Sequence, residues 1–223
     1  MGLFITFEGG EGTGKTTQAA MLLARLRREG HDALGLREPG GTPLGDYIRA
    51  WLKRTEEPLA PESELFLFVA ARAQLTRAAI EPALADGRTV VVDRYADSTT
   101  VYQGDGRHLR RSLVRAANQA ATGGLAPDLT VLLDAPAGAT LNRATARASG
   151  DALDRFEAAD AAFHRRVRAG FRRLARREPE RWLVLDALAP AEATAAVVWE
   201  RVSRMLAGAK TGGGGLDGRP RGR

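Results

Sequence analysis

Residues 7–17 constrain the fold of this chain more than any other stretch of its sequence. They read Phe-Glu-Gly-Gly-Glu-Gly-Thr-Gly-Lys-Thr-Thr and lie between a short apolar run and a segment with helical periodicity. In the strand–loop–helix context that it requires, the pattern G-x-x-x-x-G-K-[ST] is completed by Gly9, Gly14, Lys15 and Thr16. In such a loop, backbone N–H groups turn toward an anion, the lysine supplies charge for terminal phosphates, and the threonine hydroxyl can bind Mg²⁺. A purely structural glycine-rich turn rarely also places Lys-Thr at a helix start, so the stretch predicts nucleotide phosphate binding.

The composition limits the kind of protein in which this loop is placed. The 223 residues suit one domain of ordinary size, with enough apolar residues for a core. The sequence has no cysteine, which excludes disulfides and thiolate metal sites and suits a reducing cytoplasm. No apolar run approaches the roughly 20 residues of a membrane span, and the N-terminus leads directly into a predicted strand rather than a signal peptide. We therefore expect a cytoplasmic location and no membrane partner.

The net charge of +6 invites a nucleic-acid interpretation, so the location of the charge matters. Residues 207–223 contain four basic residues and one acidic residue, and they therefore carry half of the excess. This segment is rich in glycine and has almost nothing to bury, which is typical of a disordered tail. A basic body also suits a protein that binds phosphates, so we expect no nucleic-acid partner. The predicted organisation is one domain over residues 1–207 and a disordered tail over 208–223.

Five short apolar runs alternate with longer helical stretches along the chain. The runs are nearly continuous rather than alternating, as expected of parallel strands buried on both faces. They are Leu3–Phe7, Ala33–Arg37, Thr89–Asp93, Leu129–Asp134 and Trp182–Asp186. Helices are predicted to begin near Thr16, Pro43, Pro61, Arg110, Pro136, Glu157 and Pro190. Such alternation implies right-handed crossovers and a three-layer α/β sandwich around a five-stranded parallel sheet.

Charged residues end or follow several of these runs, at the sheet edge where parallel sheets bind their ligands. They include Glu8, Arg37, Asp93 and Asp134. Asp93 can hold Mg²⁺ opposite Thr16, directly or through water, although a capping or salt-bridged aspartate is the structural alternative. Arg94 follows, and its guanidinium suits the oxygens of a phosphate.

Two further patterns combine arginines with aromatic or small residues. Phe68 and Arg72 share a helix face, where a ring beside a guanidinium could stack on a base and donate to its carbonyl. Taken alone, this pair is better explained by a core phenylalanine and a surface arginine. Arg143 and Arg147 share another face and Arg155 follows a run of small residues, which suits a mobile lid that closes cations onto phosphates. A solvated basic helix is the simpler interpretation of that segment by itself.

Taken together, these motifs resemble the thymidylate kinase family, whose members phosphorylate dTMP with ATP. The phosphate-binding loop of residues 7–17, the P-loop, is followed in order by four further motifs. They are Arg37-Glu-Pro-Gly-Gly-Thr42, Phe68-x-x-x-Arg72, Asp93-Arg94-Tyr95 with Tyr102-Gln103-Gly104, and a lid over about 143–157. The match covers about residues 3–206, and the five-part set is specific to this kinase, whereas a P-loop alone is specific only to a superfamily. The resemblance implies the P-loop NTPase fold of nucleoside monophosphate kinases, ATP and Mg²⁺ as cofactors, and a homodimer.

The resemblance also implies roles for individual residues. Glu11 is expected at the deoxyribose 3′-hydroxyl, and Tyr102 near the 2′ edge of the sugar, where it disfavours ribonucleotides. Thymine is expected to be held by Phe68, Arg72, Ser98 and Gln103, and the acceptor phosphate by Arg37 and Arg94. Mg²⁺ is expected at Thr16 and Asp93. The residues expected to bind ATP are Gly9, Gly10, Glu11, Gly12, Thr13, Gly14, Lys15, Thr16, Thr17 and Arg143.

The source of the catalytic cations distinguishes types within this family. Gly12 stands where some members carry a P-loop arginine, so the lid must supply the charge, as in the bacterial type with an acidic P-loop. The expected catalytic residues are Lys15, Arg94, Arg147 and Arg155. Because nucleophile and leaving group are both phosphate oxygens, no strong base is required, and positioning with charge neutralisation does most of the catalysis.

Three other functions remain compatible with parts of the sequence. Another nucleoside monophosphate kinase would share the architecture, and since thymine and uracil share the ring face and O4, only the 5-methyl group and the sugar separate their nucleotides. A GTPase-like switch needs an Asn-Lys-x-Asp motif, which neither of the two asparagines, Asn118 and Asn142, begins. A nucleic-acid-binding P-loop protein would use the basic tail, and DNA-stimulated hydrolysis without dTMP would support it.

We predict that Arg147→Ala or Arg155→Ala lowers kcat much more than it weakens ATP binding. These side chains are expected to reach the phosphates only in the closed lid, and therefore to act chiefly in the transition state. By analogy with arginine fingers the loss is expected to reach ~10³-fold, and lysine replacements are expected to recover only part of it. Steady-state kinetics with nucleotide titrations measure both effects. If both alanine variants keep kcat within a few-fold, the cations come from elsewhere, with Arg94 the next residue to test.

Overall fold

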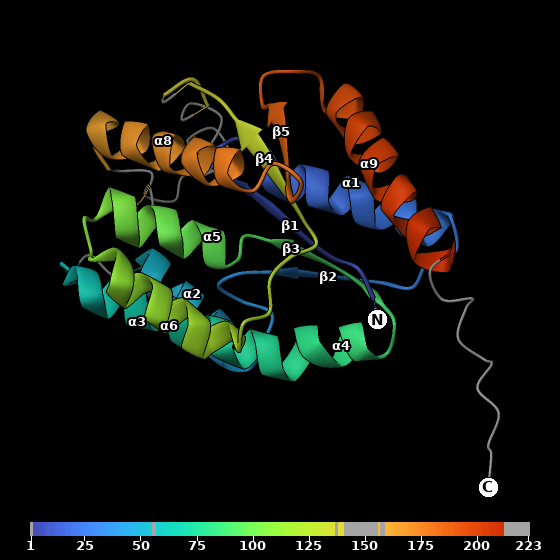
Figure 1. The fold of residues 1–223 in the computed structure, drawn as a ribbon. Coiled ribbons are helices and arrows are strands. Elements are labelled where there is room, and N and C mark those ends of the chain that lie inside the picture. The colour runs from blue at the N-terminus through green and yellow to red at the C-terminus, as the bar shows by residue number, and fades with distance from the viewer. Residues whose placement is uncertain (1, 55–56, 137, 141–155, 157–158, 212–223) are drawn as a thin grey trace, which may run out of the picture.

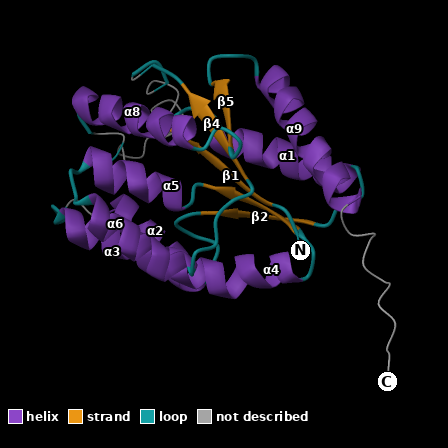
Figure 2. Ribbon diagram, viewed as in Figure 1, coloured by secondary structure: helices purple, strands orange, loops and turns teal. Residues whose placement is uncertain are grey.

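A five-stranded parallel sheet lies between two layers of helices in the computed structural model of the chain (Figure 1, Figure 2). The structure describes residues 2–54, 57–136, 138–140, 156 and 159–211. The strand order is β2-β3-β1-β4-β5, and every neighbouring pair is parallel. The predicted fold class, a three-layer α/β sandwich, is therefore confirmed.

The strands follow the predicted apolar runs closely. They are β1 (Phe4–Gly9), β2 (Ala33–Arg37), β3 (Thr89–Asp93), β4 (Leu129–Asp134) and β5 (Trp182–Asp186). Only β1 differs from its predicted bounds. The sequence places Glu8 after this strand, whereas in the structure it lies within β1, opposite Leu132, and is completely buried.

Most long helices begin near their predicted starts. They are α1 (Lys15–Arg28), α2 (Pro43–Arg54), α3 (Pro61–Leu75), α6 (Arg111–Thr122), α8 (Ala161–Arg177) and α9 (Ala191–Thr211). α8 begins at Ala161 rather than near Glu157, because the Asp160 carboxylate caps it by accepting from the Phe163 N–H at 2.6 Å. The helix predicted from Pro136 falls largely on residues outside the described part of the chain. No helix among the described residues is long and apolar enough to cross a membrane.

Four short helical segments have no counterpart in the prediction. η1 (Thr76–Ile80) and α4 (Glu81–Ala85) continue α3, and Pro82 is tolerated because it stands in the first turn of α4. α5 (Ala96–Thr99) and η2 (Thr100–Gly106) follow β3. At the C-terminus, α9 continues past the predicted domain end at residue 207, and residues 212–223 of the predicted tail lie outside the described part.

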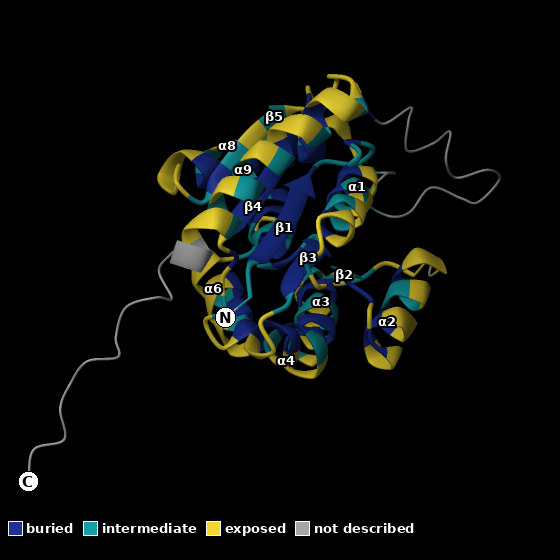
Figure 3. Cartoon of the chain, turned by 90° about the vertical axis from the view of Figure 1, so that its right-hand side faces the viewer, coloured by how far each residue is buried: buried dark blue, intermediate teal, exposed yellow. Residues whose placement is uncertain are grey.

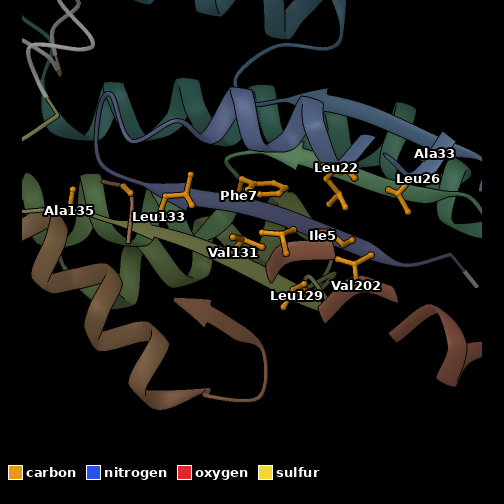
Figure 4. Packing of buried hydrophobic residues seen from close by; sticks show 13 residues of the cluster. Ile5, Phe7, Leu22, Leu26, Ala33, Leu129, Val131, Leu133, Ala135 and Val202 are labelled. Carbon is orange, nitrogen blue, oxygen red and sulfur yellow. The ribbon is translucent and has the colours of Figure 1, made fainter. Parts of the chain in front are cut away.

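Successive side chains along each strand point to opposite faces of the sheet and pack against different helix layers. On one face, Ile5 and Phe7 of β1 pack with α1 and α9 through a cluster that includes Leu22, Leu26 and Val202 (Figure 4). On the other face, two clusters involve η1, α4, η2 and α8, and their strand residues are Phe4, Val90, Val92, Leu132 and Trp182. Figure 3 shows the result as dark blue strands inside helices whose outer faces are yellow. Because side chains alternate along a strand, Glu8 shares its face with Phe4 and Thr6, toward the layer that contains α5.

The position of β1 in the sheet determines where a ligand can bind. β1 lies between β3 and β4, and the chain leaves all three strands at the same edge of the sheet. The loop after β1 is the P-loop, and the loop after β3 carries Arg94. In open parallel sheets this edge, at the point where the strand order reverses, is the usual ligand site.

Candidate active site

The loop between β1 and α1 has the backbone geometry that its glycines predict. Gly9 has a φ of 144° and Gly14 a φ of 91°, a region where an L side chain is strained. A Cβ atom on Gly9 would lie 2.5 Å from the carbonyl oxygen of Leu133, so the neighbouring strand leaves no room for a side chain. Gly14 is the N-cap of α1, which leaves the first N–H groups of that helix directed at the loop.

The polar side chains of the loop are arranged around its backbone. Lys15 is buried, and its Nζ donates to the Gly10 carbonyl at 2.6 Å and contacts Thr13 Oγ1 at 3.4 Å. Thr16 and Thr17 are exposed on the first turn of α1. Gly12 contributes no side chain, so Lys15 is the cation that the loop itself offers to an anion.

The two predicted metal ligands lie together. Thr16 Oγ1 donates to Asp93 Oδ2 at 2.5 Å, because β1 and β3 are neighbours in the sheet. Among the described residues, no group of three or more His, Cys, Asp or Glu side chains could hold a metal alone. A hydroxyl and one carboxylate form a pair of hard oxygen ligands that suits Mg²⁺, which usually keeps waters and phosphate oxygens as its remaining ligands.

Arg94 connects the loop after β3 to the P-loop. Its NH1 donates to the Gly9 carbonyl at 3.0 Å and its NH2 to Glu11 Oε1 at 2.7 Å. Its guanidinium carbon lies 5.0 Å from the centroid of the Tyr102 ring, and the Tyr102 hydroxyl also donates to Glu11 Oε1, at 2.8 Å. The backbone of Arg94 has a φ of 70°, a strained conformation for a residue of this size.

A pocket of about 120 Å³ lies beside this arginine. The predicted substrate residues that line it are Glu11, Phe68, Arg72, Arg94, Ser98, Tyr102 and Gln103. The ring of Phe156 also lines it and packs edge-on against Phe68 and Tyr102, with centroids 5.8 and 5.5 Å away. The structure therefore gathers residues from five segments of the chain around one cavity.

Arg72 is completely buried, so the interpretation of this residue as a surface charge is wrong. Its Nε and NH2 donate to the carboxylate of Glu38, which follows β2. Its NH1 donates to Asn118 Oδ1 at 2.7 Å, and its NH2 contacts Thr99 Oγ1 at 2.8 Å. A guanidinium has five N–H groups, and these contacts leave one N–H on NH1 without a partner among the described residues.

Two predicted substrate residues have surroundings that the sequence did not indicate. Arg37 does not line this pocket, but it lies in the adjacent groove that contains Thr16 and Asp93, with its guanidinium 4.0 Å from Asp46. The Ser98 hydroxyl donates to Glu8 Oε2 at 2.6 Å and accepts from Arg94 at 3.2 Å, so this hydroxyl is already used within the protein.

Sequence reasoning missed two cations that line the pocket. Arg49 and Lys53 lie four residues apart on α2, and Arg49 also donates to the Pro39 carbonyl at 3.1 Å. The available signal was their spacing on a helix that begins directly after the Gly-Gly-Thr loop, because residues four apart share a face. The lid residues Arg143, Arg147 and Arg155 lie outside the described part of the chain.

Comparisons with known proteins identify the family of this chain. The family model for thymidylate kinase matches residues 7–198. The thymidylate kinase of Thermomicrobium roseum is 50% identical over 206 residues, which cover 92% of this chain and 97% of that protein. The thymidylate kinase of Deinococcus radiodurans is 52% identical over 202 residues, which cover 91% and 97%. The chain belongs to the thymidylate kinase family.

A solved structure of this thymidylate kinase family supports the fold as well. The crystal structure of thymidylate kinase from Ehrlichia chaffeensis is 33% identical and superposes with a TM-score of 0.69, covering 82% of this chain and 92% of that one. The resemblance noted from the sequence motifs, and the P-loop kinase fold that it implied, are thereby confirmed.

The surroundings of two P-loop residues, Glu11 and Lys15, lower their pKa values. Burial alone would raise the pKa of Glu11, but the positive charges of Arg94 and Lys15, with hydrogen bonds from Tyr102 and Arg94, lower it to about 2. Burial and the nearby Arg94 lower the pKa of Lys15 to about 8, against the attraction of Glu11. Glu11 therefore stays ionised as the partner of Arg94 at neutral pH.

Glu8 shows the opposite shift. Its Oε1 accepts from the backbone N–H groups of Tyr95 and Ser98 at 2.8 and 3.3 Å, and its Oε2 accepts from the Ser98 hydroxyl. Burial and the nearby carboxylate of Asp97 nevertheless raise its pKa from 4.5 to about 8. The carboxyl group thus binds a proton more tightly in the folded chain than in the unfolded chain.

We predict that Glu8 makes the folded chain less stable as the pH rises. Its contribution is complete below the unfolded pKa of 4.5 and is lost as the pH rises toward about 8, because ionisation then favours the unfolded state. Glu8→Gln keeps an acceptor for Tyr95 and cannot ionise. Over this pH range the unfolding free energy of the parent should therefore fall by at least about 1 kcal/mol more than that of the variant. Urea unfolding at about pH 5 and about pH 8.5 measures the difference. Glu192→Gln, on the exposed first turn of α9, is the control, and equal pH profiles for Glu8→Gln and the parent would contradict the prediction.

Proposed function

We propose that the chain transfers the γ-phosphoryl group of ATP to the phosphate of dTMP, the reaction implied by its family. The observation that carries the proposal is the position of Arg94, which joins two parts of the site. It bonds to the P-loop at Gly9 and Glu11, and it also lines the pocket that contains Phe68 and Arg72. A guanidinium at this junction is suited to a phosphate that enters from the pocket side.

The pocket supports a specific orientation of the acceptor nucleotide. Thymine lies against the Phe68 ring, and the remaining N–H of Arg72 donates to a base carbonyl. The deoxyribose lies near Glu11 and Tyr102, and the ionised Glu11 carboxylate accepts from the 3′-hydroxyl. The acceptor phosphate then lies at Arg94, with Arg49 and Lys53 in the pocket wall and Arg37 in the adjacent groove as further cations.

The transfer needs positions and charges rather than a strong base. An oxygen of the dTMP phosphate forms a bond to the γ-phosphorus as the bond to the β–γ bridging oxygen breaks, and ADP leaves with that electron pair. Lys15 and the N–H groups at the start of α1 bind the phosphates of ATP, and Arg94 holds the attacking phosphate in line. Thr16 and Asp93 would hold Mg²⁺, which when bound neutralises charge on the transferring phosphates. The lid arginines Arg147 and Arg155 complete the charge neutralisation.

A nucleotide panel and one P-loop variant test this proposal. Coupled assays of ADP release with dTMP, dUMP, UMP and AMP should give the highest kcat/KM for dTMP, and the lowest for AMP, because the amino group of adenine would meet the donor N–H of Arg72 where thymine offers a carbonyl. Lys15→Ala should lower turnover by about 10³-fold or more, because Lys15 is the cation of the loop. Arg28→Ala, in the exposed last turn of α1, is the matched control and should keep parental activity. A faster reaction with AMP, or a folded Lys15→Ala variant with near-normal activity, contradicts the proposal.

Two further parts of the proposal concern assembly and location. We propose a homodimer in which the outer face of α3 is covered by a second copy. Leu65 and Leu75 of α3 are completely buried within the chain, and the large apolar side chain on the surface of this helix is Phe66, which is 54% exposed. Burying such a ring is favourable enough to stabilise an interface. A cytoplasmic location stays a prediction from the composition.

Phe66→Glu is expected to convert the dimer to a monomer, because the interface would then have to bury an unpaired charge. Light scattering coupled to size-exclusion chromatography measures the mass of the parent and of the variant. Val197→Glu places the same charge on an apolar position of α9 that is 42% exposed, and it should leave the mass unchanged. A monomeric parent, or a dimeric Phe66→Glu variant, would show that this face is not the interface.

A further inference from the structure

A buried carboxylate lies just behind the base pocket, at the start of α3. Glu64 is 2% exposed, and its Oε1 accepts from Gln103 Nε2 at 2.9 Å. The guanidinium of Arg107 donates to both of its oxygens, from Nε at 3.2 Å and from NH2 at 3.1 Å. Gln103 lines the pocket and Glu64 does not. Glu64 can therefore affect a bound base only through a neighbouring side chain.

The chemistry of this contact determines which end of the Gln103 amide faces the pocket. A carboxylate held by an arginine fork offers acceptors only, so the atom of Gln103 that faces it must be the NH₂ group. The carbonyl Oε1 then points away from Glu64, and it has no hydrogen-bond partner among the described residues. Gln103 lines the pocket, and its Oε1 is not one of the enclosed polar atoms without a partner in the described part of the chain, whereas Gln18 Oε1 is. A free acceptor is thus presented at the pocket wall.

We propose that Glu64 is a positioning residue for base selection, which holds the Gln103 amide so that the pocket offers an acceptor to the N3–H of thymine. The inference rests on the proposed function, which places the base beside Gln103. The edge of thymine presents a donor, N3–H, between two carbonyl acceptors. A Gln103 carbonyl together with the free N–H of Arg72 complements that edge. With the amide reversed, its NH₂ group would face N3–H, and two donors would oppose each other.

The same geometry explains how the pocket rejects cytosine. The N3 of cytosine is an acceptor and its 4-position carries a donor, so both would meet groups of their own kind. A site that is built to pair a polar edge discriminates strongly against an analogue that leaves its buried groups unpaired. If the Gln103 amide were free to rotate, its NH₂ group could donate to the N3 of cytosine, and the mismatch at N3 would disappear.

Glu64→Gln tests the proposal, because it keeps the size of the side chain but can both donate and accept, which frees the Gln103 amide to reverse. The KM for dTMP should rise about 10-fold with kcat within about twofold, as for the loss of one hydrogen bond in binding. The ratio of kcat/KM for dTMP to that for dCMP should fall at the same time. Glu62→Gln removes the same charge from the same turn of α3, at an exposed position, and should change neither quantity.

A double-mutant cycle with Gln103→Ala separates positioning from a purely structural role. If Glu64 acts through Gln103, adding Glu64→Gln to the Gln103→Ala variant should change the KM and the selectivity ratio less than twofold. Equal effects of Glu64→Gln in both backgrounds overturn the proposal and leave Glu64 as a structural link between α3 and η2. If Gln103→Ala itself leaves KM and selectivity unchanged while dTMP remains the best substrate, the placement of the base at Gln103 is wrong and the dTMP kinase reaction stands. Should Glu64→Gln not fold, Glu64→Asp serves in the same cycle, because its shorter carboxylate withdraws from Gln103.

Discussion

The carboxyl group of Glu8 fastens the segment after β3 to the strand that carries the P-loop. It accepts two backbone N–H groups and one hydroxyl from residues 95–98, in a position from which water is excluded. A buried polar group of this kind is tolerable only when its hydrogen bonds are made, so the segment has one favourable position on β1. That position brings Asp93 to Thr16 and Arg94 to Gly9 and Glu11. The P-loop and the pocket, which are the proposed phosphate-binding and base-binding parts of the site, are therefore positioned by a single set of contacts.

The pocket depends on two arginine–carboxylate pairs that the chain assembles from distant segments, one completely buried and one with a partly exposed arginine. Arg72 of α3 pairs with Glu38, and Arg107 pairs with Glu64. Each pair leaves one hydrogen-bonding group for the pocket, a donor on Arg72 and, through Gln103, an acceptor. Such pairs add little net stability once the cost of desolvating both charges is counted, but they fix the orientation of polar groups that can form hydrogen bonds with a ligand. The walls of the pocket are thus specified by interactions behind them as well as by the residues that line it.

The sequence predicted the strands well, because near-continuous apolar runs bounded by charged or glycine residues are easily recognised. It also identified the P-loop and seven residues of the pocket wall, since these stand in local motifs. It failed where the deciding contact is not local. Nothing near Arg72 in the sequence indicates that Glu38 and Asn118 surround it, and nothing near Glu64 indicates Gln103. The burial of Glu8 likewise follows from β1 extending by two residues through its pairing with β4, which only the assembled sheet determines.

At position 94 the backbone conformation and the side-chain contacts favour different amino acids. Its left-handed conformation, with φ at 70°, would be adopted by glycine without strain, whereas for arginine it costs roughly 1–2 kcal/mol. Asparagine and aspartate also tolerate this conformation, but neither supplies a cation or reaches both Gly9 and Glu11. The folded state and the phosphate therefore favour different amino acids at position 94. Selection for thermal stability alone would move this position toward glycine, and any stabilised version of the enzyme chosen by that criterion would lose the side chain that connects the P-loop to the pocket.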